Sequence, residues 1–249
     1  MGARHTVLPL ACPLTPDERC AHMSTIVISG GHGKVARVLA QLLVDDGHEV
    51  VSLIRDPDQA AEVAATGAQP RVLSVEDATQ ADLADAMRGA DAVVWSAGAG
   101  GKGGPARTEA VDHLAAVRSM EAARQAGVRR YVMVSWIGSH GPQPVPEDHP
   151  LRTYALAKLE ADRYLQSTDL DWTIVGPGSL TLDAPSGRIE VGRVADAAET
   201  FTSRGNVASV IVTALGEPAT IGRVIPFRDG STEIAQALAD VPAELADRS

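Results

Sequence analysis

The sequence has little cysteine, few aromatic residues and no long apolar run. Only Cys12 and Cys20 occur among 249 residues, so no disulfide framework can hold the main body of the chain. We therefore expect a reducing, cytoplasmic location. No stretch approaches the roughly 18 apolar residues that a membrane span needs. The net charge of −10 disfavours a broad nucleic-acid interface but leaves room for a local basic pocket. We expect neither a membrane nor a nucleic acid as partner.

The N-terminal segment differs from the rest of the chain. Its first 22 residues contain three prolines and no hydrophobic periodicity, and a second methionine, Met23, follows them. The apolar stretch TVLPLACPL is short and is split by Pro9 and Pro13, which disfavours a secretory signal. We expect residues 1–23 to be a disordered extension or the product of an upstream start, and residues 24–249 to form one domain.

From Thr25 onward, short apolar strands alternate with helical patterns. Six strand candidates follow one another: TIVIS, EVVSLIR, RVLSV, DAVVWSAG, RRYVMVS and LDWTIVGPG. Short connections between strands and helices are typical of an α/β fold with a parallel sheet. Right-handed crossovers favour a doubly wound sheet, the Rossmann fold, over an eight-fold barrel, because the repeat fades after Pro177. We expect the less regular residues 177–249 to form a small cap on the substrate side.

A glycine-rich turn, GGHGKVA, joins the first strand to the first helix. Gly31, Gly33 and Ala36 match G-x-G-x-x-A, and Gly30 with the latter two matches a looser form. Side chains there would keep a pyrophosphate from the backbone amides and from the positive end of the helix. The motif predicts a dinucleotide site. The predicted cofactor contacts in this turn are Gly30, Gly31, His32, Gly33, Lys34 and Val35.

The end of the second strand bears on which dinucleotide binds. An NAD site usually has Asp or Glu there for the ribose 2′-hydroxyl, whereas an arginine can pair with the 2′-phosphate of NADP. The strand ends with Arg55, followed by Asp56. Arg55 favours NADP, and NAD remains the alternative because Asp56 offers a carboxylate to the ribose.

Tyr154 and Lys158 form a Y-x-x-x-K pair on a predicted helix. Their spacing places both on one helix face. An ammonium beside a phenol lowers the pKa of the phenol, and such a tyrosine can exchange a proton while hydride moves to or from a nicotinamide. The lysine can also hold the nicotinamide ribose. The alternative is a half-buried tyrosine beside a solvated lysine.

Together these segments resemble the short-chain dehydrogenase/reductase superfamily. The resemblance covers about residues 24–240 and rests on ISGGHGKVA, GADAVVWSAGAG, EAARQAGVRRYVMVSWIGS, YALAKLEADRYL and LDWTIVGPGSLT. It is closest to the atypical and extended branch, with its NmrA-like and biliverdin-reductase-B-like NAD(P)H-binding members. The resemblance implies that Ala97 and Gly98 line the nicotinamide side and that Pro177 touches the carboxamide region. It makes Tyr154 and Lys158 the catalytic pair.

Some positions depart from the family pattern. A serine or threonine usually follows the fifth strand to bind a substrate carbonyl, and here Ser135 ends that strand while Ser139 lies further on. We take Ser135 as the third catalytic residue. The resulting hypothesis is an NAD(P)-dependent oxidoreductase for a small carbonyl, alcohol or quinone. The alternatives are a non-catalytic NADP(H)-binding redox sensor and an NAD-dependent sugar epimerase.

Three further predictions concern metals, loops and assembly. The histidines of HGPQPVPEDH do not suggest an ordered metal site, and we predict none. The glycine-rich segment 98–107, which contains Lys102, is either a flap over the site or a plain surface loop. The long helices before the fifth and sixth strands could pair two copies of the chain as a homodimer.

Overall fold

The computed structural model describes residues 23–100, 103–139, 145–192 and 200–241. The predicted extension 1–22, Lys102 and the histidine at position 140 lie outside the described residues. The six expected strands and the helices between them are all present within the described ranges.

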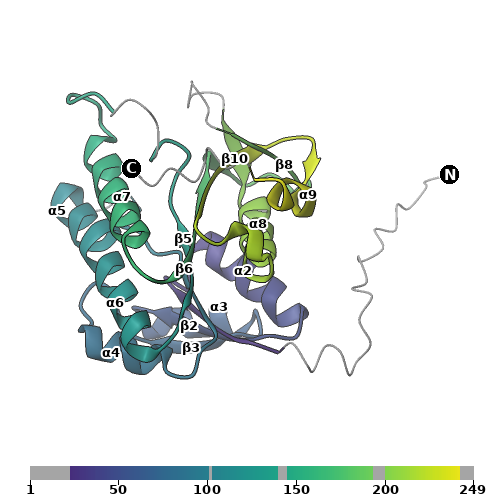
Figure 1. Cartoon of the computed structure of the whole chain (residues 1–249). Helices are drawn as coiled ribbons and strands as arrows, with labels where there is room; N and C mark the ends of the chain where they lie inside the picture. Colours follow the sequence, from purple (N-terminus) through teal and green to yellow (C-terminus); the bar gives the residue numbers. More distant parts are fainter. Residues whose placement is uncertain (1–22, 101–102, 140–144, 193–199, 242–249) are drawn as a thin grey trace.

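A mostly parallel sheet forms the centre of the molecule (Figure 1). Its strand order is β11-β8-β10-β6-β5-β4-β1-β2-β3, with β8 antiparallel to both of its neighbours. The sheet strands are β1 Thr25–Ser29, β2 Glu49–Ile54, β3 Gln69–Val72, β4 Ala92–Trp95, β5 Arg130–Val134, β6 Asp171–Pro177, β8 Arg188–Val191, β10 Arg223–Asp229 and β11 Thr232–Glu233. The order reverses between β1 and β4, as in a doubly wound fold, so a crevice opens there at the carboxyl ends of the strands.

Helices cover both faces of the sheet (Figure 1). One face carries α2 Lys34–Asp45, α3 Ala60–Ala64, α8 Arg204–Gly216 and α9 Ile234–Ala239. The other carries α4 Gln80–Met87, α5 Gly104–Thr108, the π-helical segment η2 Glu109–Ala115, α6 Ala116–Ala126 and α7 Arg152–Gln166. Within the residues that the structure describes, two short 3₁₀ turns are also present: η1 Pro57–Gln59 and η4 Pro218–Thr220.

Apolar patterning explains why the first two elements form. The strand β1 is apolar at consecutive positions and buried along almost its whole length, as expected for a central parallel strand covered on both faces. Helix α2 buries a stripe at helical spacing: Val35, Ala36, Leu39, Ala40 and Leu43. These two elements hold the glycine turn rigidly between them.

The C-terminal region differs from the expected cap, because much of it extends the central sheet. The strand β10 pairs in parallel with β6, and β8 pairs antiparallel with β10. Helix α8 packs beside α2, with Val207, Val210 and Ile211 fully buried. Burial of these apolar residues favours continuation of the layers over a separate cap. Only the short strands β7 Ser179–Thr181 and β9 Phe201–Ser203 form a separate two-stranded sheet.

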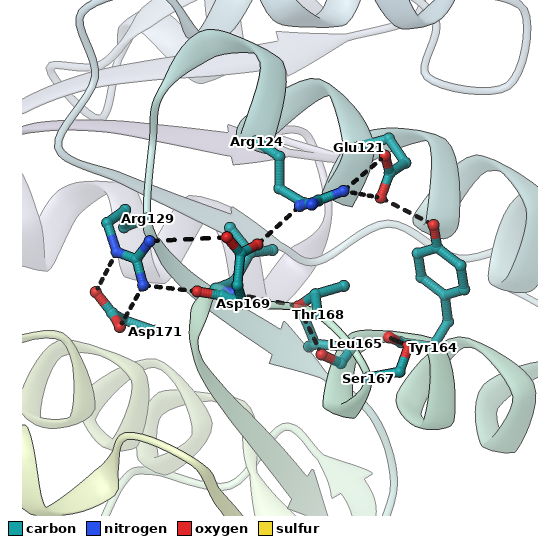
Figure 2. A network of polar contacts seen from close by, with 10 residues as sticks. Glu121, Arg124, Arg129, Tyr164, Leu165, Ser167, Thr168, Asp169 and Asp171 are labelled. Carbon is teal, nitrogen blue, oxygen red and sulfur yellow. Dashed lines mark hydrogen bonds and ion pairs between the residues drawn. The ribbon is translucent and has the colours of Figure 1, made fainter.

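A network of charged side chains lies at the end of the sheet that is opposite the carboxyl ends of the parallel strands (Figure 2). Arg124 at the end of α6 bonds to Asp169, and Arg129 bonds to Asp171 at the start of β6. Glu121 accepts from both Arg124 and Tyr164, which links α6 to α7. These exposed pairs fix the helix ends and lie away from the carboxyl ends of the strands. None of the described helices has the length and apolarity needed to cross a membrane.

Candidate active site

Two adjoining cavities lie at the carboxyl ends of the central strands. The β2-side cavity, about 290 Å³, is lined by residues that include Arg55 and Glu76. The β6-side cavity, about 360 Å³, is lined by residues that include Tyr154 and Lys158. Five residues line both: Gly33, Ser96, Ala97, Gly98 and Gly100. The cleft therefore runs across β1 and β4, where a doubly wound sheet binds its ligand.

The three glycines of the turn have different reasons for being glycine. Gly30 has a φ of +79°, and a Cβ there would lie 2.7 Å from the Ala97 Cα. A Cβ on Gly31 would lie 2.4 Å from the Ser52 Cβ. Packing against neighbouring strands therefore requires Gly30 and Gly31, which differs from the ligand-based reason that the motif suggests. Gly33 has more room, with its nearest neighbour 3.2 Å from a built Cβ, and it lines both cavities.

The start of α2 presents backbone donors that no side chain caps. Gly33 is its N-cap and offers no side chain to the first N–H groups, and the first turn holds no acidic residue. The uncapped N–H groups and the positive end of the helix dipole favour an anion. Lys34, the first helical residue, and Val35 line the β6-side cavity beside it. This arrangement fits the pyrophosphate of a dinucleotide.

Arg55 is exposed and lines the β2-side cavity, as the sequence predicts. The neighbouring Asp56 caps η1 by accepting a hydrogen bond from the Asp58 N–H at 3.0 Å. One carboxylate oxygen of Asp56, the residue that the NAD alternative assigns to the ribose, is therefore engaged in the turn. His32 lines the same cavity, with Nε2 3.3 Å from the Glu62 carboxylate. Arg55 supplies an exposed cation at this end of the cleft.

The described part of the glycine-rich segment is anchored. Arg107 on α5 makes a two-pronged ion pair with Glu76, with Nε and Nη2 at 3.0 and 2.8 Å from Oε2. The Ala99 N–H donates to Asp112 at 3.0 Å. A Cβ on Gly98 would lie 2.9 Å from the same carboxylate. These contacts bring Gly98 and Ala99 against η2 and form one wall of the cleft.

Tyr154 and Lys158 both line the β6-side cavity from one face of α7. The ammonium of Lys158 is buried and donates to the Val134 carbonyl at 2.7 Å. The ring of Tyr154 packs edge-on against Trp136, with centroids 6.1 Å apart. The lysine is therefore a buried, anchored group, in contrast to the solvated lysine of the alternative interpretation.

The expected lowering of the Tyr154 pKa is wrong for this arrangement. Burial raises the pKa of Tyr154, and the carboxylates of Asp112 and Asp162 raise it further. Burial also lowers the pKa of Lys158, while the same two carboxylates oppose that change. Tyr154 is thus a protonated phenol at neutral pH.

Two buried carboxylates in the site escape sequence reasoning. Asp112 lies in η2, and burial raises the pKa of its carboxyl group. Asp162 lies one turn beyond Lys158 on α7 and is fully buried. Asp162 could have been noticed because its i+4 spacing continues the face that carries Tyr154 and Lys158. For Asp112 no such local signal exists, since its partners lie elsewhere in the sequence.

Ser135 has a different hydrogen-bond partner from the expected substrate carbonyl. Its hydroxyl donates to Asp162 Oδ2 at 2.5 Å, and the Ser139 Oγ lies 3.2 Å away. The Ser139 hydroxyl donates to the Trp136 carbonyl at 3.0 Å. A serine has one hydroxyl hydrogen, so Ser135 cannot donate to a carbonyl while it holds Asp162. Its role as a catalytic residue stays a prediction.

The remaining predicted residues lie as follows. Ala97 and Gly98 line both cavities, and Pro177 at the end of β6 lines the β6-side cavity. Gly31 packs on Ser52 beneath the turn. Apart from Gly31, the predicted site residues thus converge on one continuous cleft. Trp136, Leu180 and Arg204 line the same cavity, and sequence reasoning assigned them no role.

Comparison with known proteins identifies the family. The model of an NAD(P)H-binding family matches residues 30–218, which include the glycine turn and the Tyr154–Lys158 pair. The chain belongs to this NAD(P)H-binding family. The predicted NAD(P)H-binding family and the Rossmann-like fold are confirmed.

Named relatives have related descriptions. YhfK of Bacillus subtilis, described as an uncharacterized sugar epimerase, is 32% identical over 214 residues, which are 86% of this chain and 98% of that protein. A candidate NAD-dependent epimerase/dehydratase of Bacillus halodurans has a TM-score of 0.80 and 32% identity, covering 88% of this chain and all of the other. The oxidoreductase YlbE of Lactococcus lactis has a TM-score of 0.77 and 30% identity, covering 87% and 96%. The chain thus shares its fold and most of its length with proteins of these descriptions.

Proposed function

We propose that the protein is an NADP-dependent oxidoreductase that reduces a small carbonyl compound or oxidises the corresponding alcohol. The observation that carries the proposal is the cleft itself, where the uncapped start of α2 and the Tyr154–Lys158 pair line one cavity. Bound NADPH would supply a hydride at this point. The family membership supports the cofactor class, and Arg55 favours the phosphorylated form.

The backbone around Gly33 and the side chain of Lys34 would hold the pyrophosphate. Arg55 would pair with the 2′-phosphate, and Lys158 would hold the nicotinamide ribose. Ala97, Gly98 and Pro177 would line the nicotinamide. Every one of these residues lies along the two adjoining cavities. Of the two cavities, Arg55 lines only the β2-side one and Lys158 only the β6-side one, while Gly33 lines both, which supports an extended dinucleotide lying across them.

Tyr154 would act as the general acid. In carbonyl reduction, hydride adds to the carbonyl carbon while the phenol of Tyr154 gives its proton to the carbonyl oxygen. The raised pKa of Tyr154 keeps that proton in place at neutral pH. Lys158, fixed by the Val134 carbonyl, would then balance the phenolate left behind. Ser135 would support the site by orienting Asp162.

Steady-state kinetics of Tyr154→Phe test the proposal. NADPH consumption is measured with a panel of aldehydes, ketones and quinones. The variant should lose about 10²- to 10⁴-fold in kcat, the usual contribution of a general acid, with NADPH affinity retained. Normal turnover by the variant would contradict the assignment. Tight NADPH binding without turnover of any panel member would favour a redox sensor.

A second candidate function is epimerisation with a retained cofactor. The relatives named as a sugar epimerase and as an epimerase/dehydratase favour it. Only as a phenolate could the same tyrosine take a hydroxyl proton while hydride leaves the carbon and later returns to its other face. Its mark is substrate isomerisation with no net change in the amount of reduced nucleotide, which distinguishes it from the first candidate.

A further inference from the structure

The β6-side cavity has an apolar wall and a cationic one. Trp136 and Leu180 line it as apolar side chains, and Leu180 is 40% exposed toward solvent. Arg204, the first residue of α8, lines the same cavity. Leu180 stands near the end of the motif LDWTIVGPGSLT, whereas Arg204 lies outside the quoted motifs. Neither residue is among those proposed to hold the cofactor.

The guanidinium of Arg204 is held in place by backbone carbonyls. Its Nη1 donates to the Leu180 carbonyl at 3.2 Å and to the Thr181 carbonyl at 2.5 Å. Both acceptors lie on β7, so the arginine ties α8 to the two-stranded β7–β9 sheet. Ser203 caps α8 by accepting from the Asn206 N–H at 3.1 Å, which fixes the backbone at the base of the side chain. The group is therefore positioned before any ligand arrives.

The charge of Arg204 has no carboxylate partner among the residues that the structure describes. Carbonyl oxygens engage Nη1 alone, which leaves the hydrogens of Nε and Nη2 without an acceptor in those ranges. Two parallel N–H donors of a guanidinium match the two oxygens of a carboxylate or phosphate. The geometry is thus suited to a planar, two-point contact with an oxyanion.

The other charges of the cavity are paired with each other or assigned to the cofactor by the proposed function. Lys158 and Asp112 are buried and face each other electrostatically, each shifting the pKa of the other toward the charged form. Lys34 stands at the start of α2, where the proposed function assigns it to the pyrophosphate. Arg204 remains as a cation without an assigned partner. It does so in a chain whose net charge is −10, so the cation does not reflect a generally basic surface.

We propose that Arg204 is the specificity-determining residue of the substrate site, and that it binds an oxyanion group on the substrate. This inference rests on the proposed function. The substrate class is a small carbonyl or alcohol that carries a carboxylate or phosphate at one end and an apolar portion against Trp136 and Leu180. The cavity volume of about 360 Å³ limits the substrate to a small molecule once a nicotinamide shares that space.

The test compares two aldehydes that differ by one carboxylate group, para-carboxybenzaldehyde and benzaldehyde. The wild-type protein should reduce para-carboxybenzaldehyde with a higher kcat/KM than benzaldehyde. In Arg204→Gln, kcat/KM should fall about 10-fold or more for para-carboxybenzaldehyde, in line with the loss of one charged hydrogen-bonded contact. For benzaldehyde, kcat/KM should fall less than about 2-fold. Arg163→Gln, an exposed arginine of α7 paired with Glu160, is the matched control and should change neither.

Arg204→Lys separates fork geometry from charge. The lysine keeps the positive charge but lacks the two parallel donors. Its kcat/KM for para-carboxybenzaldehyde should therefore lie between those of Arg204→Gln and the wild type. Thermal unfolding of both variants checks that α8 remains folded. An equal loss for both aldehydes, or a weaker NADPH affinity in Arg204→Gln, would overturn the proposal because the arginine would then serve the fold or the cofactor.

Direct binding keeps this inference separate from the proposed reaction. If neither aldehyde is turned over, the reaction is the part that has failed, and calorimetry with benzoate, phenyl phosphate and the neutral benzamide tests the site. Both anions should bind wild type in the presence of NADPH and lose that binding in Arg204→Gln. The stronger anion identifies which oxyanion the site prefers. Equal binding of benzamide, or binding that survives the substitution, would overturn the oxyanion site.

Discussion

Ser135 donates its hydroxyl hydrogen to Asp162 at 2.5 Å, and both side chains are buried. This pairing joins the end of β5 to the face of α7 that carries the tyrosine and the lysine. The carboxylate is held one helical turn from Lys158, where it supports the charged form of the lysine. The serine thus contributes to the site through Asp162.

Ser135→Ala should therefore affect stability more than chemistry. Removing a donor from a buried carboxylate costs about 1–3 kcal/mol in the free energy of unfolding. Turnover should fall only a few-fold, far less than in Tyr154→Phe. Urea unfolding and steady-state kinetics on the same preparation measure both effects. A loss of turnover as large as that of Tyr154→Phe, with stability unchanged, would mean that Ser135 contacts the substrate directly.

Arg55→Gln should change nucleotide preference. Loss of a charged hydrogen bond to the 2′-phosphate should weaken NADPH binding about 10- to 100-fold and leave NADH binding almost unchanged. Fluorescence titration with both nucleotides gives the ratio. Arg88→Gln, whose guanidinium is exposed and paired with Asp85, is the control. If NADPH and NADH weaken equally, Arg55 does not read the 2′-phosphate.

Asp112→Asn should lower the pKa of Tyr154. The Asp112 carboxylate is one of the charges that raise this pKa, so its removal makes the phenolate less unfavourable. The tyrosinate absorbance of each protein is titrated and corrected with the matching Tyr154→Phe variant. In the wild type, Tyr154 should ionise above its ordinary value of 10.0, and the Asn variant should ionise at lower pH. An unchanged titration would show that the Asp112 carboxylate does not contribute to this pKa.

Gly33→Ala and Gly31→Ala should behave differently. The added methyl group at Gly33 meets its nearest neighbour at 3.2 Å, and the backbone φ of −57° suits alanine, so the fold should survive. The same methyl lies beside the proposed pyrophosphate and should reduce NADPH affinity. At Gly31 the methyl would clash with Ser52 at 2.4 Å, so thermal stability should fall. Full NADPH affinity in a folded Gly33→Ala protein would argue against a phosphate at this turn.

Local signals in the sequence predict much of the molecule. The apolar run of β1, the glycines after it and the stripe of α2 specify strand, turn and helix within about twenty residues. The Tyr154–Lys158 spacing places two side chains on one helix face by helical geometry alone. These features need no knowledge of distant contacts, which is why they could be read in advance.

Features that depend on distant partners could not be predicted. Ser135 meets Asp162 across 27 positions, and β10 pairs with β6 across the whole of β7 to β9. The pKa of Tyr154 depends on Asp112, which arrives from η2 on another part of the chain. Burial and two carboxylates raise this pKa, so the presence of Lys158 at i+4 does not predict the direction of the shift. Long-range packing decided each of these points.

The central claim is that a nicotinamide dinucleotide lies along the cleft from Arg55 to Tyr154. Calorimetric titration of the wild-type protein with NADPH, NADP⁺, NADH and NAD⁺ tests it most directly. The account predicts one binding site per chain, with both NADP forms bound more tightly than their NAD counterparts. Absence of binding by all four nucleotides at millimolar concentration would contradict it.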